Sequence, residues 1–139
     1  MQELKLLADK LGKFPEELRA IKEEVLTFAG NQMLEEVRNS IDSSGIQDLN
    51  GRVKSWQELH VGSGLGYAAV RATDASGGVN SPGAITTYLE RGHKTRNPAK
   101  RAKAYYFYTH SRGVLDGRIM NETKQLLEKR IAEALEGLT

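Results

Sequence analysis

Residues 81–110 divide the chain and read SPGAITTYLERGHKTRNPAKRAKAYYFYTH. Pro82 and Gly83 break the preceding segment. Ile85 and Leu89 lie four residues apart and favour a short helix over 84–90 that ends at Gly92, although residues 85–88 also have strand propensity. A basic, proline-containing loop follows, and the aromatic composition of residues 104–110 predicts a strand.

The chain before this run is predicted to begin with two helices. Leucines at helical spacing predict the first over residues 2–12, ending at Gly12. A second, long helix is predicted from Pro15 to Ile41, because one apolar stripe runs through Leu18, Ile21, Val25, Phe28, Ala29, Met33 and Val37. A small sheet cannot cover a helix of this length, so part of it is expected to pack on another subunit. The alternative is a helix that simply lies across the sheet.

The remaining segments predict a small antiparallel sheet and a last helix. Residues 42–45 stop the long helix, and strands are predicted over Arg52–Val61 and Leu65–Thr73 with a hairpin connection at 62–64. Residues 73–83 are expected to form a surface loop. After a break at Gly113, the helix is predicted over Ile119–Leu135. The prediction is one α+β domain over 1–139, with a helical arm (1–42), a sheet with loops (52–110) and a C-terminal helix (114–137).

The composition excludes several classes of protein. The 139 residues are 39% hydrophobic and 27% charged, which is typical of a folded domain, and no apolar run has membrane-spanning length. The first residues also do not resemble a signal peptide. Without cysteine the chain has no disulfide and no thiolate nucleophile or metal ligand, a composition that fits folding inside a cell.

The charge is unevenly distributed along the chain. Residues 1–50 hold ten acidic and six basic residues, whereas residues 91–113, here the basic segment, hold seven basic residues and no acidic one. Within it, Lys94, Arg96, Lys100, Arg101 and Lys103 are candidates for contact with phosphates or with another subunit. A solvated loop is the alternative interpretation.

No catalytic, metal or cofactor site is predicted. The glycines at 62, 64 and 66 lack the spacing and the following helix of a nucleotide-binding loop. His60, His93 and His110 lie on separate elements and do not have metal-site spacing. Glu90 has no partner for acid–base chemistry, so it is expected to accept backbone N–H bonds beside the Gly92 turn or to bind an arginine of a neighbouring chain.

The segment AITTYLERG resembles the signature of a known family through Ala84, Tyr88, Leu89, Glu90 and Gly92. That family comprises the small neck or tail-completion proteins of tailed phages, minor tail components typified by gene product ten of a lambdoid coliphage. The order of helix, hairpin, signature, basic loop, aromatic segment and C-terminal helix is also similar. Here Arg91 stands where the family often has an aromatic residue. The resemblance marks Tyr88, Glu90 and Gly92 as structural signature positions.

The resemblance implies a non-enzymatic virion protein of the head–tail junction, assembled in the bacterial host cytoplasm. Its partners would be further copies of itself in a ring, neighbouring neck and tail proteins, and, without sequence preference, DNA in the channel. The alternative function is a free-standing nucleic-acid-binding domain that uses residues 91–112. A small hydrolase or metalloenzyme centred on Glu90 and His93 is the third hypothesis.

Overall fold

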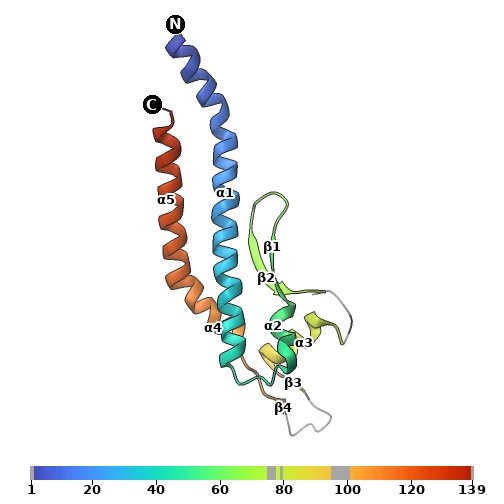
Figure 1. Ribbon diagram of the computed structural model, residues 1–139. Helices are drawn as coiled ribbons and strands as arrows, with labels where there is room; N and C mark the ends of the chain where they lie inside the picture. The colour runs from blue at the N-terminus through green and yellow to red at the C-terminus, as the bar shows by residue number, and fades with distance from the viewer. Residues whose placement is uncertain (1, 75–77, 79, 95–100, 139) are drawn as a thin grey trace.

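One helix of 42 residues, α1 (Gln2–Ser43), runs along most of the length of the molecule (Figure 1). The computed structural model describes residues 2–74, 78, 80–94 and 101–138. The fold is 72% helical and contains the predicted long N-terminal helix, small antiparallel sheet, short central helix and C-terminal helix. The C-terminal helix packs along one side of α1, and the sheet packs along another (Figure 1).

The predicted break between two N-terminal helices is wrong, because α1 continues through Gly12 and Pro15. A proline removes one backbone hydrogen bond and crowds the preceding turn. Both Pro15 and Leu11, whose carbonyl loses its partner, are exposed, so water can bind that carbonyl. The helix tilts in its N-terminal third (Figure 1), as expected near an internal proline.

The C-terminal helix α5 (Met120–Glu136) lies antiparallel to α1. Two ion pairs mark the register: Arg130 Nε lies 2.9 Å from Glu24 Oε1, and Arg118 Nη2 lies 3.6 Å from Glu36 Oε2. The helical path begins earlier than predicted, with α4 (Phe107–Val114) and one wide π-helical turn (Leu115–Ile119) leading into α5. The predicted strand over 104–110 is therefore wrong.

The core lies where the C-terminal part of α1 meets α4 and the short helix α2 (Arg52–Trp56). Val37, Ile41, Val53 and Phe107 form its buried centre. Beside it, Ser111 Oγ donates to Ser40 Oγ at 2.9 Å, and both serines are buried. Small side chains at this crossing let α1 and α4 approach closely. Burial of Phe107 explains why the aromatic block forms a helix instead of a strand.

The small sheet is the hairpin of β1 (Gln57–Val61) and β2 (Ala68–Ala72). The strands pair antiparallel, with Gln57 opposite Ala72 and Val61 opposite Ala68. Both are shorter than predicted. Residues 52–56 form α2 because the Asp48 carboxylate accepts the N–H groups of Val53 and Lys54 at 2.8 and 3.0 Å. A short 3₁₀ turn, Leu49–Gly51, precedes them.

Gly30 of α1 faces the β1 strand, where the side chain of Leu59 occupies the space that a Cβ atom would take. The sheet therefore lies directly on the backbone of α1. The predicted loop over 73–83 is described in part only, since residues 75–77 and 79 lie outside the described ranges. Within the described ranges, no helix combines the length and the apolar character needed to cross a membrane.

Candidate functional site

The signature residues lie on and just after α3 (Pro82–Arg91), which confirms the predicted short helix. Its start follows the usual rules, because the Ser81 hydroxyl accepts the N–H of Ala84 at 3.2 Å and Pro82 occupies the first turn. It ends at Gly92, whose N–H donates to the carbonyl of Tyr88 at 2.8 Å. The local sequence thus determines both ends of α3.

Glu90 is buried, with 7% of its surface exposed, and binds the start of another helix. Its Oε2 accepts the N–H of Tyr108 at 2.9 Å. Its Oε1 accepts the N–H of Thr109 at 3.1 Å and the Thr109 hydroxyl at 2.9 Å. These N–H groups belong to the first turn of α4, where the preceding residue Tyr106 provides no side-chain cap. Glu90 therefore accepts backbone N–H bonds, as expected, and caps α4 from outside with a charge that suits the helix dipole.

Backbone hydrogen bonds tie the end of α3 to the segment that leads into α4. Tyr105 N–H donates to Leu89 O at 2.9 Å, and Tyr106 N–H donates to Glu90 O at 3.1 Å. Gly92 has φ 73° and ψ 173°, a conformation that is essentially restricted to glycine. A Cβ atom at Gly92 would lie 2.5 Å from the carbonyl oxygen of Ala102. Glu90 and Gly92 together determine where the chain turns back and where α4 begins.

A buried polar cluster lies beside Glu90 and was missed by the sequence analysis. Gln57 is fully buried. Its Nε2 donates to Val53 O at 3.1 Å and to Thr86 Oγ1 at 3.3 Å, and its Oε1 accepts the hydroxyl of Tyr108. Burial, and then the nearby charge of Glu90, raises the pKa of the Tyr108 phenol. No local pattern predicts the partners of Gln57, because Thr86 and Tyr108 are 29 and 51 residues away along the chain.

Replacing Tyr108 with phenylalanine is expected to destabilise the protein by about 1–3 kcal/mol, because the buried Gln57 oxygen loses its donor. The raised phenol pKa gives the wild type a further signature. The folded state favours the neutral phenol. Tyr108 therefore makes its full contribution to the free energy of unfolding below pH ~10, and this contribution declines as the pH rises further. Urea denaturation at pH ~8 and ~10.5 measures the destabilisation and its pH dependence. From the lower to the higher pH, Tyr108→Phe should lose less free energy of unfolding than the wild type.

Tyr106→Phe is the matched control, since this tyrosine is two residues away and 56% exposed. It should change the free energy of unfolding by less than ~0.5 kcal/mol. An equal loss in both variants would contradict the assigned bond to Gln57.

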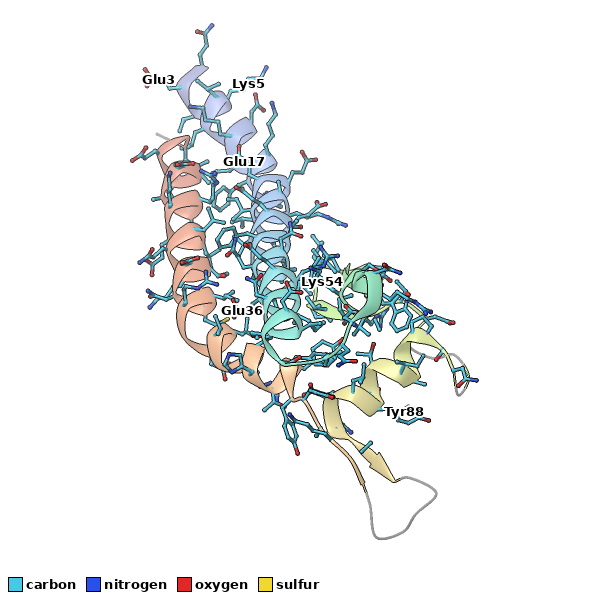
Figure 2. All side chains as sticks on the ribbon, turned by 60° about the horizontal axis from the view of Figure 1, so that its bottom comes forward. Glu3, Lys5, Glu17, Glu36, Lys54 and Tyr88 are labelled. Carbon is cyan, nitrogen blue, oxygen red and sulfur yellow. The ribbon has the colours of Figure 1, made fainter. Side chains whose placement is uncertain are left out.

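Tyr88 lies on the outer surface of α3, 38% exposed, and projects away from the body of the molecule (Figure 2). The structure therefore separates the three signature residues: Glu90 and Gly92 are in contact with the chain's own backbone, whereas Tyr88 is at the surface.

Two of the basic candidates lie on β3 and β4, at the end of the molecule opposite the start of α1 (Figure 1). Lys94 and Arg101 lie opposite each other in the short antiparallel pair β3 (His93–Lys94) and β4 (Arg101–Ala102). Lys103 is exposed, with Nζ 5.3 Å from the ring centroid of Tyr105. Arg96 and Lys100 lie outside the described residues. β3 thus directly follows the turn at Gly92, which we call the signature turn.

The carboxylate of Glu90 is engaged in holding α4. Both oxygens of Glu90 already accept hydrogen bonds from the first turn of α4. Among residues 2–74, 78, 80–94 and 101–138, no three side chains of the metal-binding types cluster. A shallow cavity of about 360 Å³ lies elsewhere, between α1 and α2, and its charged lining includes Glu35, Arg38, Asp42 and Lys54. Its Lys54–Asp42 pair, 3.1 Å apart, is at the surface.

No protein-family model, no curated protein and no solved structure matches this chain.

Proposed function

We propose that this protein is a structural subunit of the head–tail junction of a tailed phage, a prophage or a phage-derived tail particle. Copies would join in a ring around the DNA channel, between portal-side and tail-side components, and the subunit would act in assembly without catalysing a reaction. The resemblance of residues 84–92 to the neck-protein signature motivates the proposal.

The observation that carries it is an elongated subunit with unlike surfaces at its two ends (Figure 1). At one end, the first turns of α1 expose leucines that no described segment buries. At the other end lie β3 and β4, which carry Lys94 and Arg101 beside the signature turn (Figure 1). Exposed leucines at one end and basic residues at the other suit a subunit that is completed by its neighbours, and the acidic N-terminal half offers complementary charge.

Two measurements test the assembly role. Purified protein is mixed with the products of neighbouring phage-type genes, sized, and imaged for ring-shaped or neck-shaped particles. Association with a connector or tail component supports the proposal, even if the isolated subunit is monomeric. A protein that binds none of them, from a gene outside any capsid and tail cluster, would contradict it.

The second candidate function is a free-standing nucleic-acid-binding domain that uses residues 91–112. It is favoured by the absence of acidic residues throughout the basic segment. Binding to duplex DNA should then weaken steeply with salt. The logarithm of the binding constant should fall with the logarithm of the salt concentration, with a slope of about −0.9 for each phosphate neutralised.

Replacing Lys100, Arg101 and Lys103 together with alanine is expected to reduce that slope by roughly 2–3, because three phosphate contacts are lost. Fluorescence anisotropy with a labelled duplex between ~50 and ~200 mM salt measures the slope. Lys5, Lys10 and Lys13 at the other end of the molecule, replaced together, are the matched control. An equal effect of both triple variants, or no binding at low salt, removes this second function.

A further inference from the structure

The first turns of α1 present a surface built for another helix. In α1, Leu4, Leu7, Leu11, Phe14, Leu18, Ile21, Val25 and Phe28 follow one another at spacings that alternate between three and four residues. This is the heptad pattern in which helices pack side by side, with each apolar residue fitting between four residues of the facing helix.

The C-terminal half of this stripe is already covered by a helix of the same chain. Ile21 and Val25 are the first buried apolar residues of α1, and the stripe there lies against α5. The ion pairs Glu24–Arg130 and Glu36–Arg118 fix the antiparallel register. Carried along both helices residue for residue, that register places Glu136, the last residue of α5, opposite Leu18.

The leucines of the N-terminal half are exposed. We call residues 2–17 the N-terminal arm, which extends about 24 Å beyond the end of α5 at 1.5 Å per residue (Figure 1). Within it, Leu4, Leu7 and Leu11 are 66%, 41% and 51% exposed, and Leu18 at its base is 39% exposed. Glu3 and Lys5 mark its charged outer faces (Figure 2).

We propose that the N-terminal arms of two copies pair antiparallel through this stripe. The argument for a second copy is continuity: the same stripe, a few turns further on, already binds a helix of this chain in antiparallel orientation. This contact goes beyond the proposed ring, because a two-fold contact joins two copies and does not itself close a ring.

The position of α5 decides the alignment. In an antiparallel pair of helices, residues at one apolar position of the heptad face residues at the other apolar position. Leu7 can therefore face Leu11 of the other copy, and Leu4 can face Phe14. Moving the second arm one heptad further would place its Leu4 on Ile21, where α5 already lies. Parallel pairing would bring the ends of both α5 helices to the same level of the seam, where they would crowd each other. The antiparallel alignment keeps the two α5 helices apart.

Leu11→Glu is expected to raise the dimer dissociation constant at least ~100-fold, because a two-fold contact introduces the charge twice into the apolar seam. Leu6→Glu is the matched control. Leu6 is 56% exposed on the same turns but faces away from the stripe, so its substitution should change the constant less than ~3-fold. Sedimentation equilibrium of the full chain measures both, and circular dichroism checks that each variant is folded.

Single cysteines report the orientation, since the chain has none of its own. Ala8→Cys should cross-link two antiparallel copies on oxidation, because position 8 lies near the two-fold axis of this alignment. Leu4→Cys should cross-link only parallel copies. A cross-link through Leu4→Cys without one through Ala8→Cys would overturn the antiparallel contact.

Three further results would overturn the pairing: a wild type that stays monomeric at about 200 μM, equal effects of Leu11→Glu and Leu6→Glu, or binding of the arm to phosphatidylglycerol vesicles without dimerisation. A monomer that still joins neck components would overturn the arm contact and leave the proposed function standing. A dimer sensitive to Leu11→Glu that joins no neck or tail component would support the contact and remove the proposed function.

Discussion

Gly92→Ala is expected to lower the free energy of unfolding by about 3 kcal/mol or more. Two costs add: the backbone at φ 73° and ψ 173° is strained for any residue with a Cβ atom, and that atom would lie 2.5 Å from the Ala102 carbonyl oxygen. The clash involves backbone, so no side-chain rotation relieves it. Thermal unfolding followed by circular dichroism should show a midpoint about 10 °C or more lower.

Gly113→Ala is the matched control. Gly113 lies within α4 and has open space where its Cβ would be. Alanine is favoured over glycine inside a helix, so this substitution should be neutral or stabilise by up to ~1 kcal/mol. A Gly92→Ala variant as stable as Gly113→Ala would mean that the backbone at position 92 does not require glycine.

Glu90→Ala should destabilise the protein by roughly 2–4 kcal/mol. The substitution removes three hydrogen bonds to one charged carboxylate and leaves the N–H groups of Tyr108 and Thr109 without their acceptor. Amide hydrogen exchange should accelerate most at Tyr108 and Thr109, because α4 starts there. Glu90→Gln should be intermediate, since an amide retains a single acceptor oxygen.

The surface substitution Glu128→Ala provides the comparison. Glu128 forms only an exposed pair with Lys124 at 4.0 Å, so the expected change is below ~0.5 kcal/mol. A cycle with Thr109→Val measures the coupling to Glu90 directly, and contacting groups should deviate from additivity by at least ~0.5 kcal/mol. Additive effects would contradict the cap.

For the signature turn, these predictions separate folding from assembly. Both Glu90 and Gly92 act on the chain's own backbone, so their substitution should reduce stability before it affects any partner. The N-terminal arm is the opposite case. Because its leucines are exposed, Leu11→Glu should leave the thermal midpoint of the monomer, measured well below the dimer dissociation constant, nearly unchanged while weakening association. Stability and association measured together therefore distinguish the two surfaces.

The apolar periodicity was sufficient to predict the main helices. The stripe from Leu18 to Val37 predicted the long helix, and a similar stripe predicted the C-terminal one. The same rules failed where a local preference opposed a tertiary contact. Gly12 and Pro15 predicted a break that α1 does not have, because one lost hydrogen bond at an exposed position costs less than ending the helix. The aromatic residues near Phe107 predicted a strand, yet burial of Phe107 in the core favours a helix.

By itself, the sequence determined those elements whose signals lie within a turn or two of each other, as in α3, where Ser81 caps the start and Gly92 ends it. It also marked Glu90 as a partner either of backbone N–H groups or of an arginine of a neighbouring chain. Only the tertiary structure decided which groups: the donors at Tyr108 and Thr109 are 18 and 19 residues away, and the Tyr108–Gln57 contact spans 51. The physical reason is that caps and buried polar pairs depend on distance in space, whereas helical periodicity depends on distance along the chain.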